Sequence, residues 1–92
     1  MTVTHIVKTW PAYFQAVKRG EKRFEIRRDD RGYQKGDLLE QREYDPQLGV
    51  TERQHYTGDH ITHRIAYVLT GGQFGLEPGF VALSLEESSD DR

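Results

Sequence analysis

Hydrophobic and polar residues alternate over several short stretches of this 92-residue chain, and clusters of Gly, Asp and Pro separate those stretches. Such alternation is typical of β-strands, because successive side chains of an extended backbone point to opposite faces. Gly, Asp and Pro favour the turns that join strands. We therefore predict strands at residues 2–8, 22–28, 38–44, 50–56, 60–69 and 80–85.

One segment near the N-terminus has helical periodicity instead. Pro11 suits the first position of a helix, where the missing N–H leaves no hydrogen bond unmade. Gly20 suits the left-handed residue that commonly follows the last helical turn. We predict a helix that opens at Trp10-Pro11 and ends before Gly20, with an apolar face made of Trp10, Tyr13, Phe14 and Val17.

One helix among five or six short strands predicts an α+β, mostly β protein. The expected architecture is a small β-barrel of about five to six strands with the N-terminal helix packed on it. A chain of this length suits one domain, which we assign to residues 1–85. Residues 86–92 form an acidic, polar tail that we predict to be disordered.

Composition limits the classes of site that the chain can carry. Hydrophobic residues make up 35% of the sequence and charged residues 30%, so the core must be small. Cysteine is absent, which excludes disulfides, thiolate metal sites and a cysteine nucleophile, and fits a reducing compartment. His60 and His63 would point to opposite faces of a strand. We expect no metal and no cofactor.

The sequence has neither a signal peptide nor an apolar run long enough to span a membrane. The expected protein is therefore cytoplasmic and without a membrane partner. The sequence leaves the oligomeric state open, and we favour a monomer. Its charge is uneven: residues 1–42 carry ten Lys and Arg against six Asp and Glu, a net charge of +4. A basic half can attract an anionic ligand, but charges scattered over a solvated surface explain the same count.

The segment 22–28 combines alternation with a high density of charge. In an extended backbone Phe24 and Ile26 point to one face while Glu25 and Arg27 point to the other. We expect the two apolar residues to fill the barrel core. Glu25 and Arg27 would then form either a cross-strand ion network on an exposed sheet or a fixed recognition element, with Lys22 at its mouth.

The same strand carries the signature of ASCH domains, which belong to the PUA-like superfamily, in the form Gly20-x-Lys22-x-x-Glu25-x-Arg27. Over residues 4–85 the chain resembles a small prokaryotic and phage ASCH-like family. The motifs that carry this resemblance lie at His5–Phe14, Phe24–Arg31, Gly36-Asp37, Glu43–Asp45, Tyr56–Gly58 and Gly72–Leu76.

The resemblance implies a PUA-like β-barrel with a cleft between barrel and helix that binds RNA or a nucleobase. Carried over residue by residue, it places three side chains of the signature strand, two from the helix entrance and two from the Gly-rich loop in this cleft. Arg28 and Tyr33 join them on chemical grounds. The predicted ligand-binding residues are Lys8, Trp10, Lys22, Glu25, Arg27, Arg28, Tyr33, Gln73 and Phe74.

The polar members of this set suit different parts of a nucleotide. Lys8, Arg27 and Arg28 can contact phosphate. Glu25 can accept hydrogen bonds from an exocyclic amine, and Gln73 can both donate and accept.

The aromatic members can stack on a base. Trp10, Tyr33 and Phe74 provide flat faces for this purpose. Trp10 has an alternative role in the core, since it begins the apolar face of the helix. Phe74 lies in a Gly-rich loop, where exposure is at least as compatible with the sequence as burial.

The favoured function is a non-catalytic module that binds RNA or a modified nucleobase or nucleoside. Some ASCH relatives are instead enzymes that remove acetyl from N4-acetylcytidine with a Lys, a Thr and a Glu, and a few are ribonucleases. Lys22 and Glu25 are the candidate catalytic pair for that alternative, although positions 23–28 contain no Thr or Ser. A third alternative is a protein-interaction or phage-accessory module that uses the acidic tail and residues 44–58.

Overall fold

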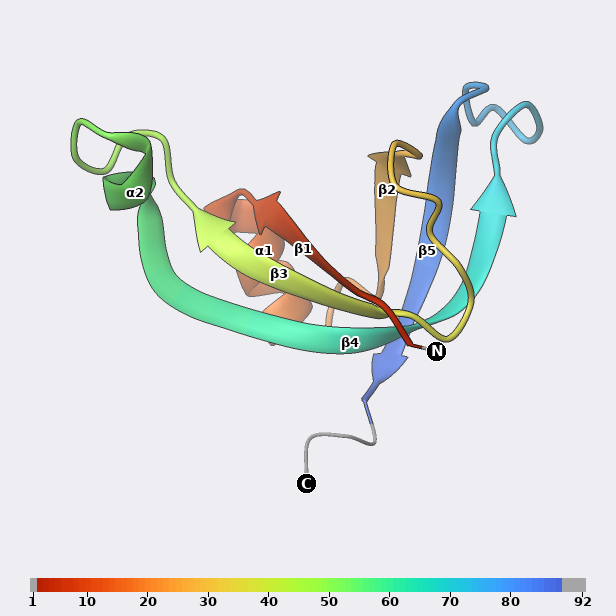
Figure 1. Ribbon diagram of the computed structural model, residues 1–92, viewed down its shortest axis with the longest axis horizontal. Coiled ribbons are helices and arrows are strands. Elements are labelled where there is room, and N and C mark those ends of the chain that lie inside the picture. The colour runs from red at the N-terminus through yellow and green to blue at the C-terminus, as the bar shows by residue number, and fades with distance from the viewer. Residues whose placement is uncertain (1, 89–92) are drawn as a thin grey trace.

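The computed structural model describes residues 2–88, and within them the chain forms one five-stranded sheet curved into a half-barrel, with two helices (Figure 1). The predicted fold class, mostly β with an N-terminal helix, is confirmed. In chain order the elements are β1 (Thr4–Thr9), α1 (Pro11–Lys18), β2 (Phe24–Arg28), β3 (Leu38–Tyr44), α2 (Glu52–His55), β4 (Tyr56–Thr70) and β5 (Phe80–Glu87).

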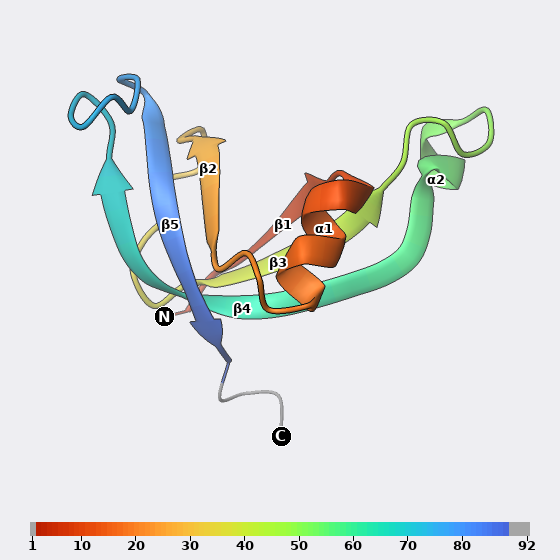
Figure 2. The ribbon, with the colours of Figure 1, turned by 180° about the vertical axis from the view of Figure 1, so that it is seen from behind.

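The long strand β4 gives the sheet its curve. The sheet order is β1-β3-β4-β5-β2, with β1 parallel to β3 and the other pairs antiparallel. The first half of β4 pairs with β3 and its second half with β5, and register shifts interrupt both pairings. Such irregularities bend strands. The edge strands β1 and β2 therefore face each other across the open side, with α1 inside the curve (Figure 2).

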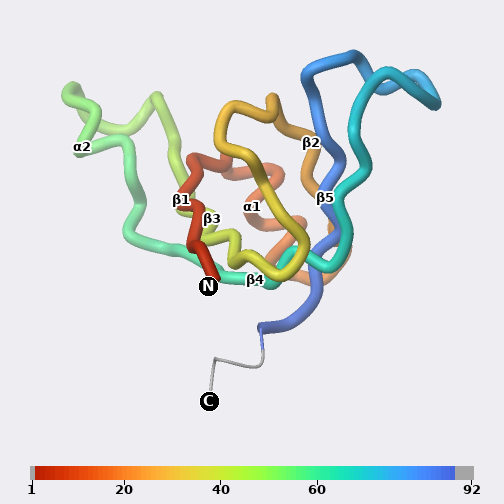
Figure 3. The backbone as a smooth tube through the Cα atoms, turned by 45° about the vertical axis from the view of Figure 1, so that its right-hand side comes forward, coloured from red at the N-terminus to blue at the C-terminus, as the bar shows by residue number. Residues whose placement is uncertain are grey.

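The segment 29–37 runs between the two edge strands across the open side (Figure 3). Side chains also bridge this side. Arg27 of β2 donates from Nη2 to the carbonyl oxygen of Lys8 at 2.7 Å, and Arg31 donates from Nη1 to that of Ile6 at 2.7 Å. These carbonyls lie on the edge of β1, which has no neighbouring strand on that side. Two arginine side chains thus donate the hydrogen bonds that a neighbouring strand would otherwise donate to these carbonyl oxygens.

The apolar core is small and occupies one part of the concave face. Its buried residues come from four strands and from the segment after β2. They are Val7, Tyr33, Leu39, Ile65, Val81, Leu83 and Leu85. From α1, Phe14 and Val17 are buried, whereas Trp10 and Tyr13 of the predicted apolar face are more than half exposed. The helix therefore buries only half of the face that its periodicity predicts.

The predicted strand at 50–56 is wrong. This segment forms the short helix α2, and β4 begins at Tyr56, so the turn predicted at 57–59 lies within a strand. Gln54 explains the difference, because its Oε1 accepts hydrogen bonds from the backbone N–H groups of Val50 and Thr51 at 2.7 and 3.1 Å. A side chain that binds the N–H groups at a helix start stabilises that start. Gly49, with φ +65°, permits the close approach of Gln54.

The last strand is longer than predicted. β5 continues to Glu87, so two residues assigned to the acidic tail pair with β4 instead, Glu86 opposite Arg64 and Glu87 opposite His63. Ser88 is buried. The remainder of the predicted tail, residues 89–92, lies outside the described residues.

The two faces of β2 are the reverse of the prediction. Phe24 and Ile26 are 49% and 55% exposed, whereas Glu25 is 5% exposed and faces inward opposite Leu83 of β5. A carboxylate can be buried only where charged and hydrogen-bonding partners replace its water. Such partners are present around Glu25, and they define the candidate site.

Candidate functional site

Glu25 is the centre of a buried polar cluster. Its Oε2 accepts hydrogen bonds from Lys22 Nζ at 2.5 Å and from Gln41 Nε2 at 2.9 Å, and its Oε1 accepts one from Arg27 Nε at 3.2 Å. Both cations are partly exposed, with 18% of the Lys22 side chain and 23% of the Arg27 side chain accessible. The buried Glu25 carboxylate is thus bound by Gln41 and lies between two partly exposed cations, Lys22 and Arg27.

A threonine from the opposite edge of the sheet completes the cluster. The Thr9 hydroxyl oxygen accepts hydrogen bonds from Gln41 Nε2 at 3.2 Å and from Arg27 Nη2 at 3.3 Å. The cluster therefore joins β1, β2 and β3, three strands that are distant in sequence. Hydrogen-bonded networks of this kind fix side-chain positions when their members are paired.

This cluster opens onto a cleft of about 360 Å³, which we call the aromatic cleft. Its rim carries three large exposed rings, those of Trp10, Tyr13 and Phe24. Lys22 Nζ lies 4.8 Å from the centroid of the Phe24 ring, within the range of a cation–π contact. The full lining consists of Thr9, Trp10, Tyr13, Lys22, Phe24, Glu25, Ile26 and Arg27.

The structure brings four of the nine predicted ligand-binding residues together in the aromatic cleft: Trp10, Lys22, Glu25 and Arg27. Lys8 lies in a neighbouring cleft, which also contains Arg27. There Lys8 forms an ion pair with Glu52, and the hydrogen bond to this carboxylate raises the pKa of the Lys8 amine. Lys8 is therefore charged at neutral pH.

The stacking role predicted for Tyr33 is wrong. Tyr33 is 4% exposed, and its ring lies in the core 4.7 Å from the ring of His5. Burial raises the pKa of the Tyr33 hydroxyl. Tyr33 follows the charged strand in the sequence, but its inward orientation depends on the path of the segment between β2 and β3, which local patterns do not reveal.

Three further predicted residues lie away from the aromatic cleft. Arg28 shares a face of β2 with Phe24 and Ile26 but does not line the aromatic cleft, and its guanidinium lies 4.8 Å from the centroid of the Phe80 ring. Gln73 and Phe74 belong to the loop between β4 and β5, where Gln73 donates to the carbonyl oxygen of Thr70 and Phe74 is 87% exposed. Neither loop residue lines the aromatic cleft.

Sequence reasoning missed Thr9, Tyr13 and Gln41 as members of the site. Thr9 and Gln41 are 32 residues apart, so no local spacing connects them. One signal was available: Gln41 sits between Leu39 and Glu43 at a spacing of two, so a polar side chain shares the inward face of a strand.

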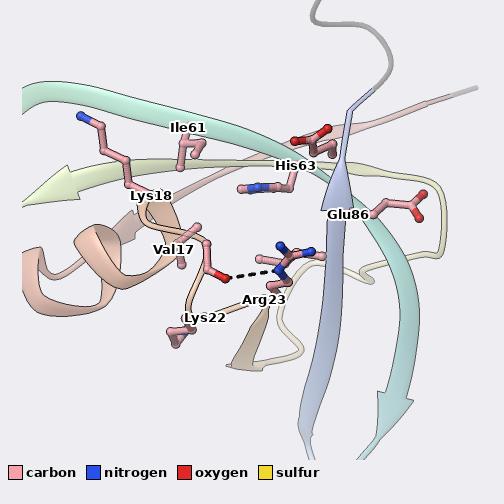
Figure 4. A pocket seen from close by; sticks show the side chains of 10 residues that line it. Val17, Lys18, Lys22, Arg23, Ile61, His63 and Glu86 are labelled. Atoms are coloured by element: carbon pink, nitrogen blue, oxygen red, sulfur yellow. Dashed lines mark hydrogen bonds between the residues drawn. The ribbon is translucent and has the colours of Figure 1, made fainter.

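A smaller cavity of about 210 Å³ lies on the other side of Lys22, between the end of α1 and strands β4 and β5 (Figure 4). Its lining mixes cations and carboxylates, among them Lys18, Arg23 and Glu86. Arg23 donates to the carbonyl oxygen of Gly20 at 3.2 Å across this cavity. The mixed charge and small volume make it a weaker candidate than the aromatic cleft.

Among residues 2–88, no group of three or more His, Asp or Glu side chains is arranged to hold a metal ion. Neither of the two helices in this part of the chain has the length and apolar composition needed to cross a membrane.

Residues 4–85 match the model of a known protein family. The chain belongs to the family described as Domain of unknown function (DUF3850). No curated protein matches the sequence. The resemblance to ASCH domains stays a prediction.

Proposed function

We propose that the aromatic cleft of this DUF3850 member binds a nucleobase or nucleoside, either free, modified or within RNA. One observation carries the proposal: a buried carboxylate, Glu25, lies at the base of a cleft whose rim presents three exposed aromatic rings. A hydrogen-bonding floor and a stacking rim are the two features that a planar, polar, nitrogen-rich ligand requires.

The floor offers both acceptor and donor groups. A carboxylate has about four lone-pair sites, and described side chains occupy three of those on Glu25. The remaining site can accept a hydrogen bond from an exocyclic amine or ring N–H of a base. Lys22, which carries three ammonium hydrogens, can donate to a base carbonyl beside that amine.

The rim offers aromatic rings that are already exposed and can stack on a base. Trp10, Tyr13 and Phe24 are each about half exposed, so a ligand would meet faces that already stand in solvent. The volume of about 360 Å³ falls within the range of about 300–1,000 Å³ found for small-molecule sites. A purely structural ion cluster explains the burial of Glu25 but leaves these three grouped rings without a role.

A second candidate function is hydrolysis of an acylated nucleoside, and the position of Thr9 favours it. The hydroxyl that is absent from positions 23–28 is supplied by β1, in the same cluster as Lys22 and Glu25. In such a reaction water would convert N4-acetylcytidine to cytidine and acetate, with Lys22 and Glu25 transferring protons. Binding is the stronger proposal, because the Thr9 oxygen already accepts two hydrogen bonds and is almost fully buried.

Isothermal titration with a panel of nucleosides, modified nucleosides and short single-stranded RNAs tests the binding proposal. We expect Lys22→Ala and Arg27→Ala each to weaken binding of the best ligand by about 1–3 kcal/mol, the range for a charge-assisted or bidentate contact. Arg28→Ala, which removes a cation outside the cleft, is the matched control. Absence of binding at millimolar ligand, with a native fold confirmed by circular dichroism, would reject the proposal.

Incubation with N4-acetylcytidine and with single-stranded RNA tests the enzymatic candidate. Release of cytidine and acetate that is lost in both Lys22→Ala and Glu25→Ala would support it. Turnover that survives both substitutions would assign the activity elsewhere.

A further inference from the structure

A second cleft, of about 340 Å³, lies against β1 and is lined by four cations and no carboxylate. We call it the arginine cleft. Its cations come from four different segments, β1, β2, the loop after β2, and β3. The full lining is Ile6, Val7, Lys8, Arg27, Arg31, Arg42 and Tyr56.

Two arginines of this cleft, Arg27 and Arg31, are held in place by hydrogen bonds that leave part of each guanidinium available. Arg27 uses Nε and Nη2 for Glu25, Thr9 and the Lys8 carbonyl. Arg31 uses Nη1 for the Ile6 carbonyl, and its Nε lies 3.7 Å from the exposed carboxylate of Asp30. Within residues 2–88, Nη1 of Arg27 and Nη2 of Arg31 make no hydrogen bond. Arginines that are already positioned lose little side-chain entropy when they bind a ligand.

The pairing of β1 with β3 places two like charges side by side. Lys8 and Arg42 are directly opposite in the parallel register, and both side chains are exposed. Like charges in opposite positions destabilise a sheet. Each cation has a carboxylate partner, Glu52 for Lys8 and Glu40 for Arg42, but these acids lie outside the cleft lining. Exposed pairs of this kind are weak, so an anion can compete for the cations.

We propose that the arginine cleft is a phosphate site and that the natural ligand is a phosphorylated nucleoside or RNA rather than a free nucleoside. Arg27 lines both clefts, so one ligand could place its base in the aromatic cleft and its phosphate in the arginine cleft. Guanidinium groups bind phosphate through paired hydrogen bonds, and several cations around one anion add to that preference. The identity of the base rests on the proposed function, whereas the anion site does not.

The test compares four probes by titration calorimetry and by ¹H–¹⁵N spectra that include the arginine Nε–H signals. The probes are a nucleoside, its 5′-monophosphate, inorganic phosphate, and a short RNA without a terminal phosphate. Arg42→Gln removes one charge from the arginine cleft, and Arg28→Gln removes one charge from an exposed strand position outside both clefts. Both substitutions lie at the surface, so the fold is expected to survive each.

We expect the monophosphate or the RNA to bind about tenfold more tightly than the nucleoside, as a charge-assisted contact implies. Arg42→Gln should remove most of that gain and leave nucleoside binding unchanged, while Arg28→Gln should leave all four probes unchanged. Preference for the monophosphate would identify a phosphomonoester as the ligand group, and preference for the RNA would identify a phosphodiester.

Two results would overturn the phosphate site: no gain of phosphorylated probes over the nucleoside, or equal losses in Arg42→Gln and Arg28→Gln. If inorganic phosphate and the monophosphate bind in an Arg42-dependent way while the nucleoside causes no change near Trp10, the phosphate site stands and the proposed function fails. If the nucleoside binds and phosphate adds nothing, the proposed function stands and the phosphate site fails.

Discussion

Two of the buried carboxylates on the concave face of the half-barrel, Asp37 and Glu25, lie in regions with different surroundings. Asp37 accepts a hydrogen bond from His5 Nε2 at 2.8 Å and one from the backbone N–H of Gln34 at 3.2 Å, next to the core ring of Tyr33. Glu25 is equally buried, but its partners Lys22 and Arg27 reach a cleft with an aromatic rim. Burial of a charge is common to both regions, so burial alone does not identify a functional site.

The feature that separates the two regions is what lies beyond the carboxylate. Around Asp37, apolar residues such as Leu39 and Ile65 complete the core, and the hydrogen bond between His5 and Asp37 joins β1 to the loop before β3. Around Glu25, the next groups are the exposed rings of Trp10, Tyr13 and Phe24. We therefore assign stability to the Asp37 region and recognition to the Glu25 region, and the following substitutions test that division.

The largest effect is expected in the core beside Asp37. Leu39→Ala removes a fully buried side chain and leaves a cavity, which should destabilise the fold by about 2–5 kcal/mol. Urea unfolding followed by circular dichroism measures this change. A loss below 1 kcal/mol, on the order of an exposed-site substitution, would contradict the division of the concave face.

Asp37→Asn should destabilise the fold by about 1–3 kcal/mol at neutral pH, because it weakens a buried charged hydrogen bond. Burial by itself raises the pKa of the Asp37 carboxyl, but hydrogen bonds from His5 and from backbone N–H groups outweigh burial and hold the pKa below its ordinary value of 3.8. The stabilisation by Asp37 is therefore complete above that value and is lost as pH falls through the lower, folded value.

Stability measured between neutral and strongly acidic pH checks the sign of this effect. The unsubstituted protein should lose more stability on acidification than Asp37→Asn does, because asparagine has no carboxyl to protonate. Asp30→Asn, at an exposed position, is the control and should follow the unsubstituted protein. Parallel pH profiles for all three proteins would remove Asp37 as a source of acid sensitivity.

Trp10→Ala should weaken binding of the best nucleoside by about 1–3 kcal/mol, the measured range for loss of a stacked base. The same substitution should change the free energy of unfolding by less than about 0.5 kcal/mol, since the side chain is more than half exposed. Phe74→Ala is the matched control, an exposed aromatic outside the cleft. Equal binding losses in the two variants would show that exposure, not the cleft, determines the effect.

Glu25→Gln should reduce affinity for an amine-bearing base about tenfold, because a neutral amide replaces the charge-assisted acceptor. It should destabilise the fold less than Asp37→Asn, since Lys22 and Arg27 can turn to solvent when their partner loses its charge. Calorimetric titration and urea unfolding of the two variants, side by side, provide the comparison. If Glu25→Gln destabilised the fold more than Asp37→Asn, and Asp37→Asn reduced ligand affinity more than Glu25→Gln, stability would be assigned to Glu25 and recognition to Asp37.

The sequence predicts local features of this protein well and their placement in three dimensions less well. Alternation and the Pro11–Gly20 limits identify β1, α1, β2, β3 and β5, because these patterns depend on neighbouring residues. The orientation of β2 was not predictable from alternation, since both of its faces carry residues that could be buried. Glu25 faces inward because Gln41, Lys22 and Arg27 meet it there, and Gln41 comes from a distant strand.

The same limit applies to the candidate site. The signature spacing places Lys22, Glu25 and Arg27 together, since they lie on one short segment. Thr9 joins them only because β1 and β2 face each other across the open side, a consequence of the bend in β4. The helix α2 depends on a capping contact of Gln54, which hydrophobic periodicity does not reveal.

Backbone chemical-shift mapping during a nucleoside titration tests the central claim most directly. The account predicts that the largest ¹H–¹⁵N shifts occur at Thr9, Trp10, Tyr13 and residues 22–27, with little change around Asp37 or in the Gly-rich loop at 71–75. Shifts concentrated in that loop or around Asp37, or no shifts at millimolar nucleoside and mononucleotide, would contradict it.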